Sequence, residues 1–226
     1  MQVQHEYYHA VFSMAFETFV LVAYSPAHAD INYWRTGVSP ADLRAEQQQF
    51  HDAALHLATT YAGKTFVLQH WEGDWSLRGS YNASQPLSPV AVAAMIDWLA
   101  ARQAGVASAR AKCSELKSCA SQILAAAEVN LVRSSYEHGW ANMVTAVVPR
   151  VSLDLISYSS YDAMQLPEFG DVLAYIARMH NRTSASPLVA VYIGEYGLPQ
   201  QSVCACVCVC VWGGVHACVR ACVRAR

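Results

Sequence analysis

The alternation of short apolar runs with helical segments constrains the fold of this 226-residue chain more than any other feature. We predict five strands, at residues 19–24, 65–69, 128–133, 151–158 and 188–193. These runs are largely apolar with little polar alternation, as expected for strands buried on both faces. Strand–helix alternation with buried strands predicts an α/β fold with a parallel sheet and right-handed crossovers.

The segments between the strands show helical periodicity. Ser39-Pro40 and Ser88-Pro89 each open a helix, with serine as the N-cap and proline at the first helical position. The second of these helices is expected to stop near Gly105, and residues 107–125 to form an exposed helical extension. Further helical periods run over about residues 140–149 and 167–180.

Two parallel architectures fit this pattern, a doubly wound sheet and a barrel. The sequence lacks the G-x-G-x-x-G turn that a dinucleotide-binding sheet would normally carry. Polar and charged residues instead follow the predicted strand ends, where a barrel collects its site residues, although doubly wound sheets share that habit. The pattern therefore favours a barrel.

Two of the predicted strands end on carboxylates in turns rich in aromatic residues and glycine. Residues 69–75 read Gln-His-Trp-Glu-Gly-Asp-Trp, and residues 192–197 read Tyr-Ile-Gly-Glu-Tyr-Gly. Retaining glycoside hydrolysis needs two carboxylates about 5 Å apart, one as acid/base and one as nucleophile. Strands of one barrel can bring Glu72 and Glu195 to the same mouth, and the flanking Trp and Tyr rings offer faces for sugar stacking.

At these residues the chain resembles the clan of (β/α)₈-barrel glycoside hydrolases that includes cellulases, mannanases and β-galactosidases. In that clan the acid/base follows strand four and the nucleophile follows strand seven. The resemblance covers about residues 16–199 and implies that Glu72 is the acid/base and Glu195 the nucleophile. It implies no cofactor and no metal. It places these residues at the carbohydrate: His70, Trp71, Asp74, Trp75, Tyr158, Tyr161 and Tyr196.

The chain departs from the clan in two respects. Trp71 stands where the clan usually has Asn before the acid/base, and Asp74 is a rival acid two residues on. The five predicted strands would correspond to strands three to seven, so strands one, two and eight lack a counterpart, and a complete barrel typically needs about 250 residues. We therefore expect a partial barrel over residues 1–201. A catalytically inactive relative, one that binds carbohydrate or has no function, is the alternative to an active hydrolase.

Residues 202–226 form a low-complexity tail rich in Cys and Val. A GT dinucleotide repeat encodes Val-Cys-Val-Cys, and a GCGT repeat encodes Ala-Cys-Val-Arg, so two simple nucleotide repeats explain most of this segment. We expect it to lie outside the fold. A metal site or disulfide cluster is the competing interpretation, but the Cys-X-Cys spacing differs from the usual zinc patterns.

Charge and hydrophobicity narrow the range of partners. A formal net charge of −2 without a basic stripe argues against nucleic acid. We expect no membrane-spanning segment and no specific protein partner. The apolar residues 10–24 are better explained by a buried strand than by a secretory signal, because residues 1–15 contain no Lys or Arg. The sequence does not specify the cellular location.

Overall fold

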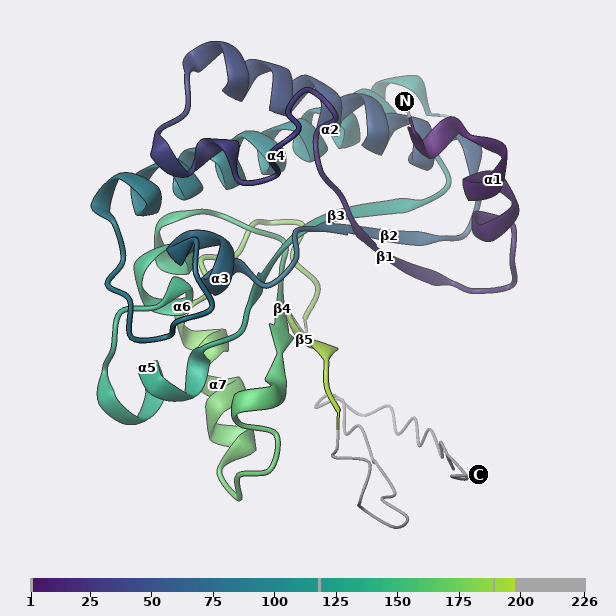
Figure 1. Ribbon diagram of the computed structural model, residues 1–226. Coiled ribbons are helices and arrows are strands. Elements are labelled where there is room, and N and C mark those ends of the chain that lie inside the picture. The colour runs from purple at the N-terminus through teal and green to yellow at the C-terminus, as the bar shows by residue number, and fades with distance from the viewer. Residues whose placement is uncertain (1, 118, 189, 198–226) are drawn as a thin grey trace, which may run out of the picture.

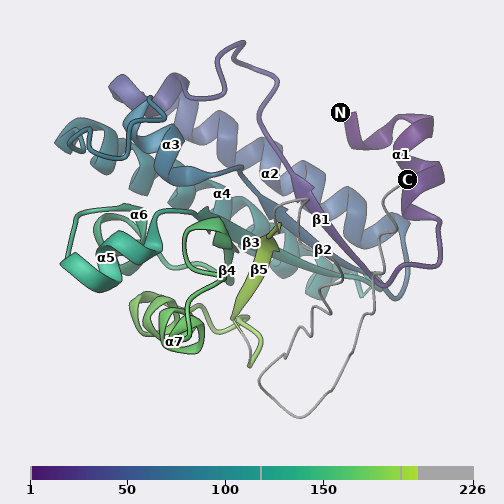
Figure 2. The ribbon, with the colours of Figure 1, turned by 60° about the horizontal axis from the view of Figure 1, so that its bottom comes forward.

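The computed structural model describes residues 2–117, 119–188 and 190–197 (Figure 1). Its strands are β1 (Thr18–Val22), β2 (Thr65–Gln69), β3 (Gln122–Val129), β4 (Leu155–Ser159) and β5 (Val191–Glu195). They form one sheet in the order β1-β2-β3-β4-β5, in which every neighbouring pair is parallel. The sheet curls into half of a barrel (Figure 2). Among the described strands the order never reverses, so this part of the sheet lacks the switch point of a doubly wound fold. The prediction of a parallel α/β fold with a partial barrel is confirmed at this level.

Helices connect successive strands. They are α2 (Pro40–Thr60), α3 (Gly73–Arg78), α4 (Pro89–Leu116), α5 (Val132–His138), α6 (Met143–Ala146) and α7 (Phe169–Met179), while α1 (Glu6–Phe12) precedes β1. The long helices α2 and α4 run side by side along β1 to β3, whereas α5, α6 and α7 lie beside β4 and β5 (Figures 1 and 2). The two predicted helix starts are confirmed, because Ser39 and Ser88 each accept a backbone hydrogen bond as N-caps.

The sequence prediction was wrong around β3. Helix α4 continues past Gly105 to Leu116, so the helical extension predicted at residues 107–125 is confirmed as far as Leu116. The last residues of that extension belong instead to β3 (Gln122–Val129), and the predicted strand 128–133 runs into α5. A Cβ at Gly105 would lie 2.4 Å from the Gln47 carbonyl oxygen, so this glycine permits close packing of α4 on α2 and does not end the helix. Residues 125–127 are alanines, which favour helices in isolation. Here they form a strand whose small side chains are buried on both faces.

Apolar side chains pack on both faces of the sheet. On the convex face, Phe19, Phe66 and Ile123 pack against Phe50 and other residues of α2 and α4. A smaller cluster of Val67, Leu124, Ala126 and Leu155 lies on the other face, with Tyr192 packed against it. Burial of each large apolar side chain stabilises the fold by about 1.5–3 kcal/mol.

Helix α4 is long and apolar enough to cross a membrane, and 61% of its most apolar window is buried inside the domain. It also carries Arg102, which is 3% exposed. The guanidinium lies 4.1 Å from the Phe50 ring centroid and 4.3 Å from that of Trp98. It donates hydrogen bonds to the carbonyl oxygens of Ala23 and Gln69. Arg102 therefore ties α4 to the ends of β1 and β2.

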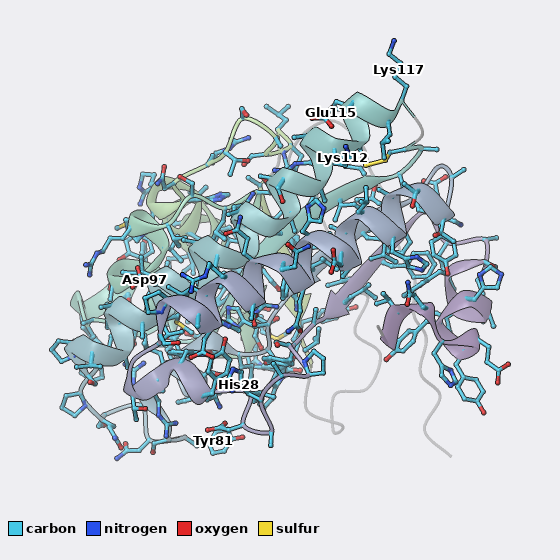
Figure 3. All side chains as sticks on the ribbon, turned by 90° about the horizontal axis from the view of Figure 1, so that it is seen from above. His28, Tyr81, Asp97, Lys112, Glu115 and Lys117 are labelled. Atoms are coloured by element: carbon cyan, nitrogen blue, oxygen red, sulfur yellow. A yellow bond between two sulfur atoms is a disulfide. The ribbon has the colours of Figure 1, made fainter. Side chains whose placement is uncertain are left out.

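A disulfide joins Cys113, near the end of α4, to Cys119, which precedes β3 (the yellow bond in Figure 3). The tail expected at residues 202–226 lies outside the described residues, as does the end of the domain predicted to close at residue 201.

Candidate functional site

The turn after β2 holds Glu72 in an unusual backbone conformation. Glu72 is left-handed, with φ 34° and ψ 70°, and it is the N-cap residue of α3. Its backbone N–H donates to Oε2 of Glu128 at 2.7 Å. The next residue must be small, since a Cβ on Gly73 would lie 2.6 Å from His70 and 2.7 Å from the Glu128 carbonyl oxygen. The strand end, the tight turn and β3 together fix the position of Glu72.

Glu195 at the end of β5 lies beside the same turn, although 123 positions separate it from Glu72 in the sequence. The indole Nε1 of Trp71 donates to Glu195 Oε1 at 3.0 Å. Ser159 Oγ, at the end of β4, donates to Glu72 Oε1 at 3.2 Å, and Ser159 is the register partner of Glu195. The curled parallel sheet thus brings these two carboxylates into one site.

The surroundings of Glu72 shift the pKa of its carboxyl. Burial, and then the like charge of Glu195, raise the pKa of Glu72 above its ordinary value, while the hydrogen bond from Ser159 opposes the shift. Burial and the Glu195 carboxylate also raise the pKa of Tyr161. A carboxyl whose pKa is raised beside a second carboxylate is suited to general acid chemistry.

A third carboxylate, Glu128, lies beneath this pair, and sequence reasoning missed it. Its side chain is 0% exposed near the end of β3. Besides the Glu72 N–H, it accepts hydrogen bonds from Ser157 Oγ at 3.0 Å and from Gln69 Nε2 at 3.5 Å. The Tyr192 hydroxyl donates to Gln69, so the four residues form a polar row across β2 to β5. Burial, partly offset by the Glu72 and Ser157 bonds, raises the pKa of Glu128. The signal that could have found it is an acid within an apolar strand.

Gly194 allows β5 to approach this row closely. A Cβ at this position would lie 2.0 Å from Ser157 Oγ and 2.7 Å from Glu128 Oε1. Real Cβ atoms do not occupy such positions, so a side chain here would displace β5 or the polar row. The Gly before Glu195 is therefore a packing requirement of the site.

Aromatic rings surround the two partly exposed carboxylates. Trp71 is 37% exposed, Tyr161 56% and Tyr196 48%. Trp75 is half-buried on α3, and its ring centroid lies 5.8 Å from that of the exposed Tyr81. Of the predicted site residues, the structure therefore brings Trp71, Tyr161 and Tyr196 to the surface near the carboxylates, with Trp75 farther along α3.

The remaining predicted site residues are buried. His70 is 1% exposed, and its Nε2 accepts the Glu128 N–H at 3.3 Å. Tyr158 is 0% exposed and donates to Asp162 Oδ1 at 2.5 Å. Asp74 is 0% exposed, and both of its carboxylate oxygens accept hydrogen bonds from the protein. In this structure these three side chains support the site from below and do not face solvent.

Within the described residues, no group of three or more His, Cys, Asp or Glu side chains is arranged to hold a metal ion. A hollow of about 380 Å³ lies elsewhere, between the end of α4 and the start of β3, and is lined by Arg110, Cys113 and Cys119 among others. It lies at the end of the sheet opposite the carboxylates. Comparisons of the chain with protein-family models, curated proteins and solved structures found no match.

Proposed function

We propose that this chain is a glycoside hydrolase of the (β/α)₈ type that cleaves O-glycosidic bonds with retention. In this proposal β1 to β5 correspond to strands three to seven, Glu72 is the acid/base and Glu195 the nucleophile. The observation that carries it is that the ends of β2 and β5 share one site. Trp71, the neighbour of Glu72, donates to Glu195, and Ser159, the register partner of Glu195, donates to Glu72.

The proposed reaction has two steps. Glu72 donates its proton to the glycosidic oxygen while Glu195 attacks the anomeric carbon, so the bond to the leaving group breaks and a glycosyl ester forms on Glu195. Glu72 then removes a proton from a water molecule, which attacks the same carbon and releases Glu195. The indole N–H of Trp71 orients the Glu195 carboxylate, and the exposed rings stack on the sugar. No cofactor is required.

A second candidate is a protein that binds carbohydrate without cleaving it. The observation in its favour is the open sheet: among the described residues β1 and β5 each pair with one neighbour only. Val20 and Val22 of β1 are 46% and 53% exposed, unlike residues in the interior of a closed barrel. An incomplete barrel would admit water to the site and weaken the electrostatic interactions of its carboxylates.

Hydrolysis of a panel of aryl glycosides by the full chain tests these proposals. We expect release of the aryl group with retention of anomeric configuration, followed by NMR. Glu195→Gln should abolish turnover, and Glu72→Gln should lower it by roughly 10²- to 10⁴-fold, with the smaller effect on substrates with good leaving groups. The raised pKa of Glu72 predicts that the loss of activity caused by deprotonation of the acid occurs at a higher pH than an ordinary glutamate pKa would give.

The matched control is Glu115→Gln, which removes an exposed carboxylate near the end of α4 (Figure 3) and should leave turnover unchanged. Sugar binding without turnover would overturn the hydrolase proposal and support the binding protein. Neither binding nor turnover on any substrate of the panel would overturn both.

A further inference from the structure

The carboxylate of Glu128 has no direct access to a ligand. Its side chain is 0% exposed, and its oxygens accept from Glu72 N–H, Ser157 and Gln69. A buried carboxylate is retained only when such donors compensate for lost hydration. The bond from Glu72 is the shortest of the three, at 2.7 Å. Glu128 can therefore affect the site only by positioning Glu72, Ser157 or Gln69.

The backbone conformation of Glu72 must be stabilised by contacts with other parts of the chain. A left-handed conformation is strained for a residue with a side chain, and it persists only where the surroundings enforce it. The Glu72 side chain makes no capping bond to α3 that would stabilise the turn locally. The bond from its N–H to Glu128 anchors the peptide between Trp71 and Glu72. The two residues that this peptide joins are Trp71, whose indole donates to Glu195, and Glu72, whose carboxyl accepts from Ser159.

We infer that Glu128 is a positioning residue that holds the Trp71–Glu72 peptide in place and thereby orients Glu72 and Trp71 toward Glu195. Without this acceptor the turn relaxes toward an ordinary backbone conformation, and the Glu72 carboxyl leaves Ser159. The catalytic consequence rests on the proposed hydrolase function, since misplacement of an acid by about 1 Å can cost roughly 10²-fold in rate. The conformational consequence does not depend on that function.

Amide hydrogen exchange of Glu72, measured by NMR on the full chain, tests the conformational step directly. Glu128→Ala removes the acceptor, so exchange at Glu72 should accelerate by roughly 10- to 100-fold relative to the wild type. Glu128→Gln keeps a neutral acceptor oxygen, so the acceleration should be smaller, roughly 3- to 10-fold. Glu115→Gln removes an exposed charge and should leave Glu72 exchange unchanged. The amide of Ala126, in the middle of β3, reports whether the sheet itself remains intact.

The kinetic arm uses the same variants. We expect Glu128→Ala to lower kcat by roughly 10²-fold with little change in KM, and Glu128→Gln to recover part of the loss. Unchanged Glu72 exchange in a folded Glu128→Ala variant would overturn the inference. If that variant does not fold, Glu128→Gln decides, and unchanged Glu72 exchange in it overturns the inference equally. A wild type without hydrolysis refutes the proposed function alone, because the exchange experiment still reports on Glu128.

Discussion

Replacing Asp74 by Asn should strongly destabilise the protein. Asp74 is 0% exposed, and its Oδ1 accepts from Met143 N–H at 2.7 Å and from Arg78 Nη1 at 3.3 Å. Its Oδ2 accepts from the N–H groups of Asn130 at 3.0 Å and Leu131 at 3.3 Å. One carboxylate thus joins α3 to the end of β3 and to the start of α6.

The expected magnitude follows from counting these donors. An asparagine amide has one oxygen, so in either orientation its NH₂ group faces two buried donors. Each stranded donor costs about 1–3 kcal/mol, and the buried Arg78 also loses its ionised partner. We expect a loss of about 4 kcal/mol, a large fraction of the roughly 5–15 kcal/mol that stabilises a typical domain.

Urea unfolding of the full chain measures this loss as a change in the free energy of unfolding. Asp97→Asn is the matched control, since Asp97 lies exposed on α4 (Figure 3) and its replacement should change stability by less than about 0.5 kcal/mol. If Asp74→Asn unfolds within about 1 kcal/mol of that control, the structural role is refuted. Weaker sugar binding with unchanged stability would instead support the substrate-binding role expected from the sequence.

Two further predictions concern the same region. Burial, and then Arg102, lower the pKa of His70 from 6.5 to about 3, so its stabilising contribution is present above about pH 6.5 and is lost as the pH falls toward 3. The wild type should therefore lose about 1.5 kcal/mol more than a His70→Gln variant between about pH 6.5 and pH 5, measured by urea unfolding; equal losses would contradict the shift. Gly194→Ala places a methyl group against the polar row and should destabilise the fold by about 1–3 kcal/mol. Gly170→Ala, where a Cβ meets nothing within 4 Å, should be neutral or slightly stabilising, and a similar effect of both variants on the urea midpoint would contradict the packing argument.

The sheet could be predicted largely because its strands are apolar and its helices carry clear start signals. The strand at Thr65–Gln69 and the N-caps Ser39 and Ser88 are local features, fixed by residues within a few positions. The segment around β3 could not be predicted in the same way. Its alanines have the local preference of a helix, and only packing between α2, α4 and the neighbouring strands makes them a strand. Gly105 was misinterpreted for the same reason, since its role depends on contacts with Gln47, Phe50 and His51 of α2, more than 50 positions earlier.

The candidate site could likewise be predicted where local sequence determines it, and could not be predicted where long-range contacts do. A strand end followed by Trp-Glu-Gly is visible in the sequence and predicted a carboxylate at the sheet edge. The sequence does not reveal which neighbouring side chains turn inward. His70 and Asp74 flank Glu72 within two residues, yet both are buried while Glu72 is only partly so. The left-handed backbone at Glu72 separates them, and it depends on Glu128, 56 positions away.

Burial and hydrogen-bond partners, more than residue type, distinguish Asp74 and Glu128 from Glu72 and Glu195. Asp74 and Glu128 are each 0% exposed and accept from several fixed donors, including backbone N–H groups, which suits a structural anchor whose acceptor oxygens are already hydrogen-bonded. Glu72 and Glu195 are partly exposed and are held by side-chain donors, Ser159 and Trp71, that a ligand can compete with. A reacting carboxylate needs free lone pairs and access to the ligand, whereas an anchor needs neither. Because the two anchors hold the turn from beneath, Glu72 and Glu195 remain available at the surface of the site.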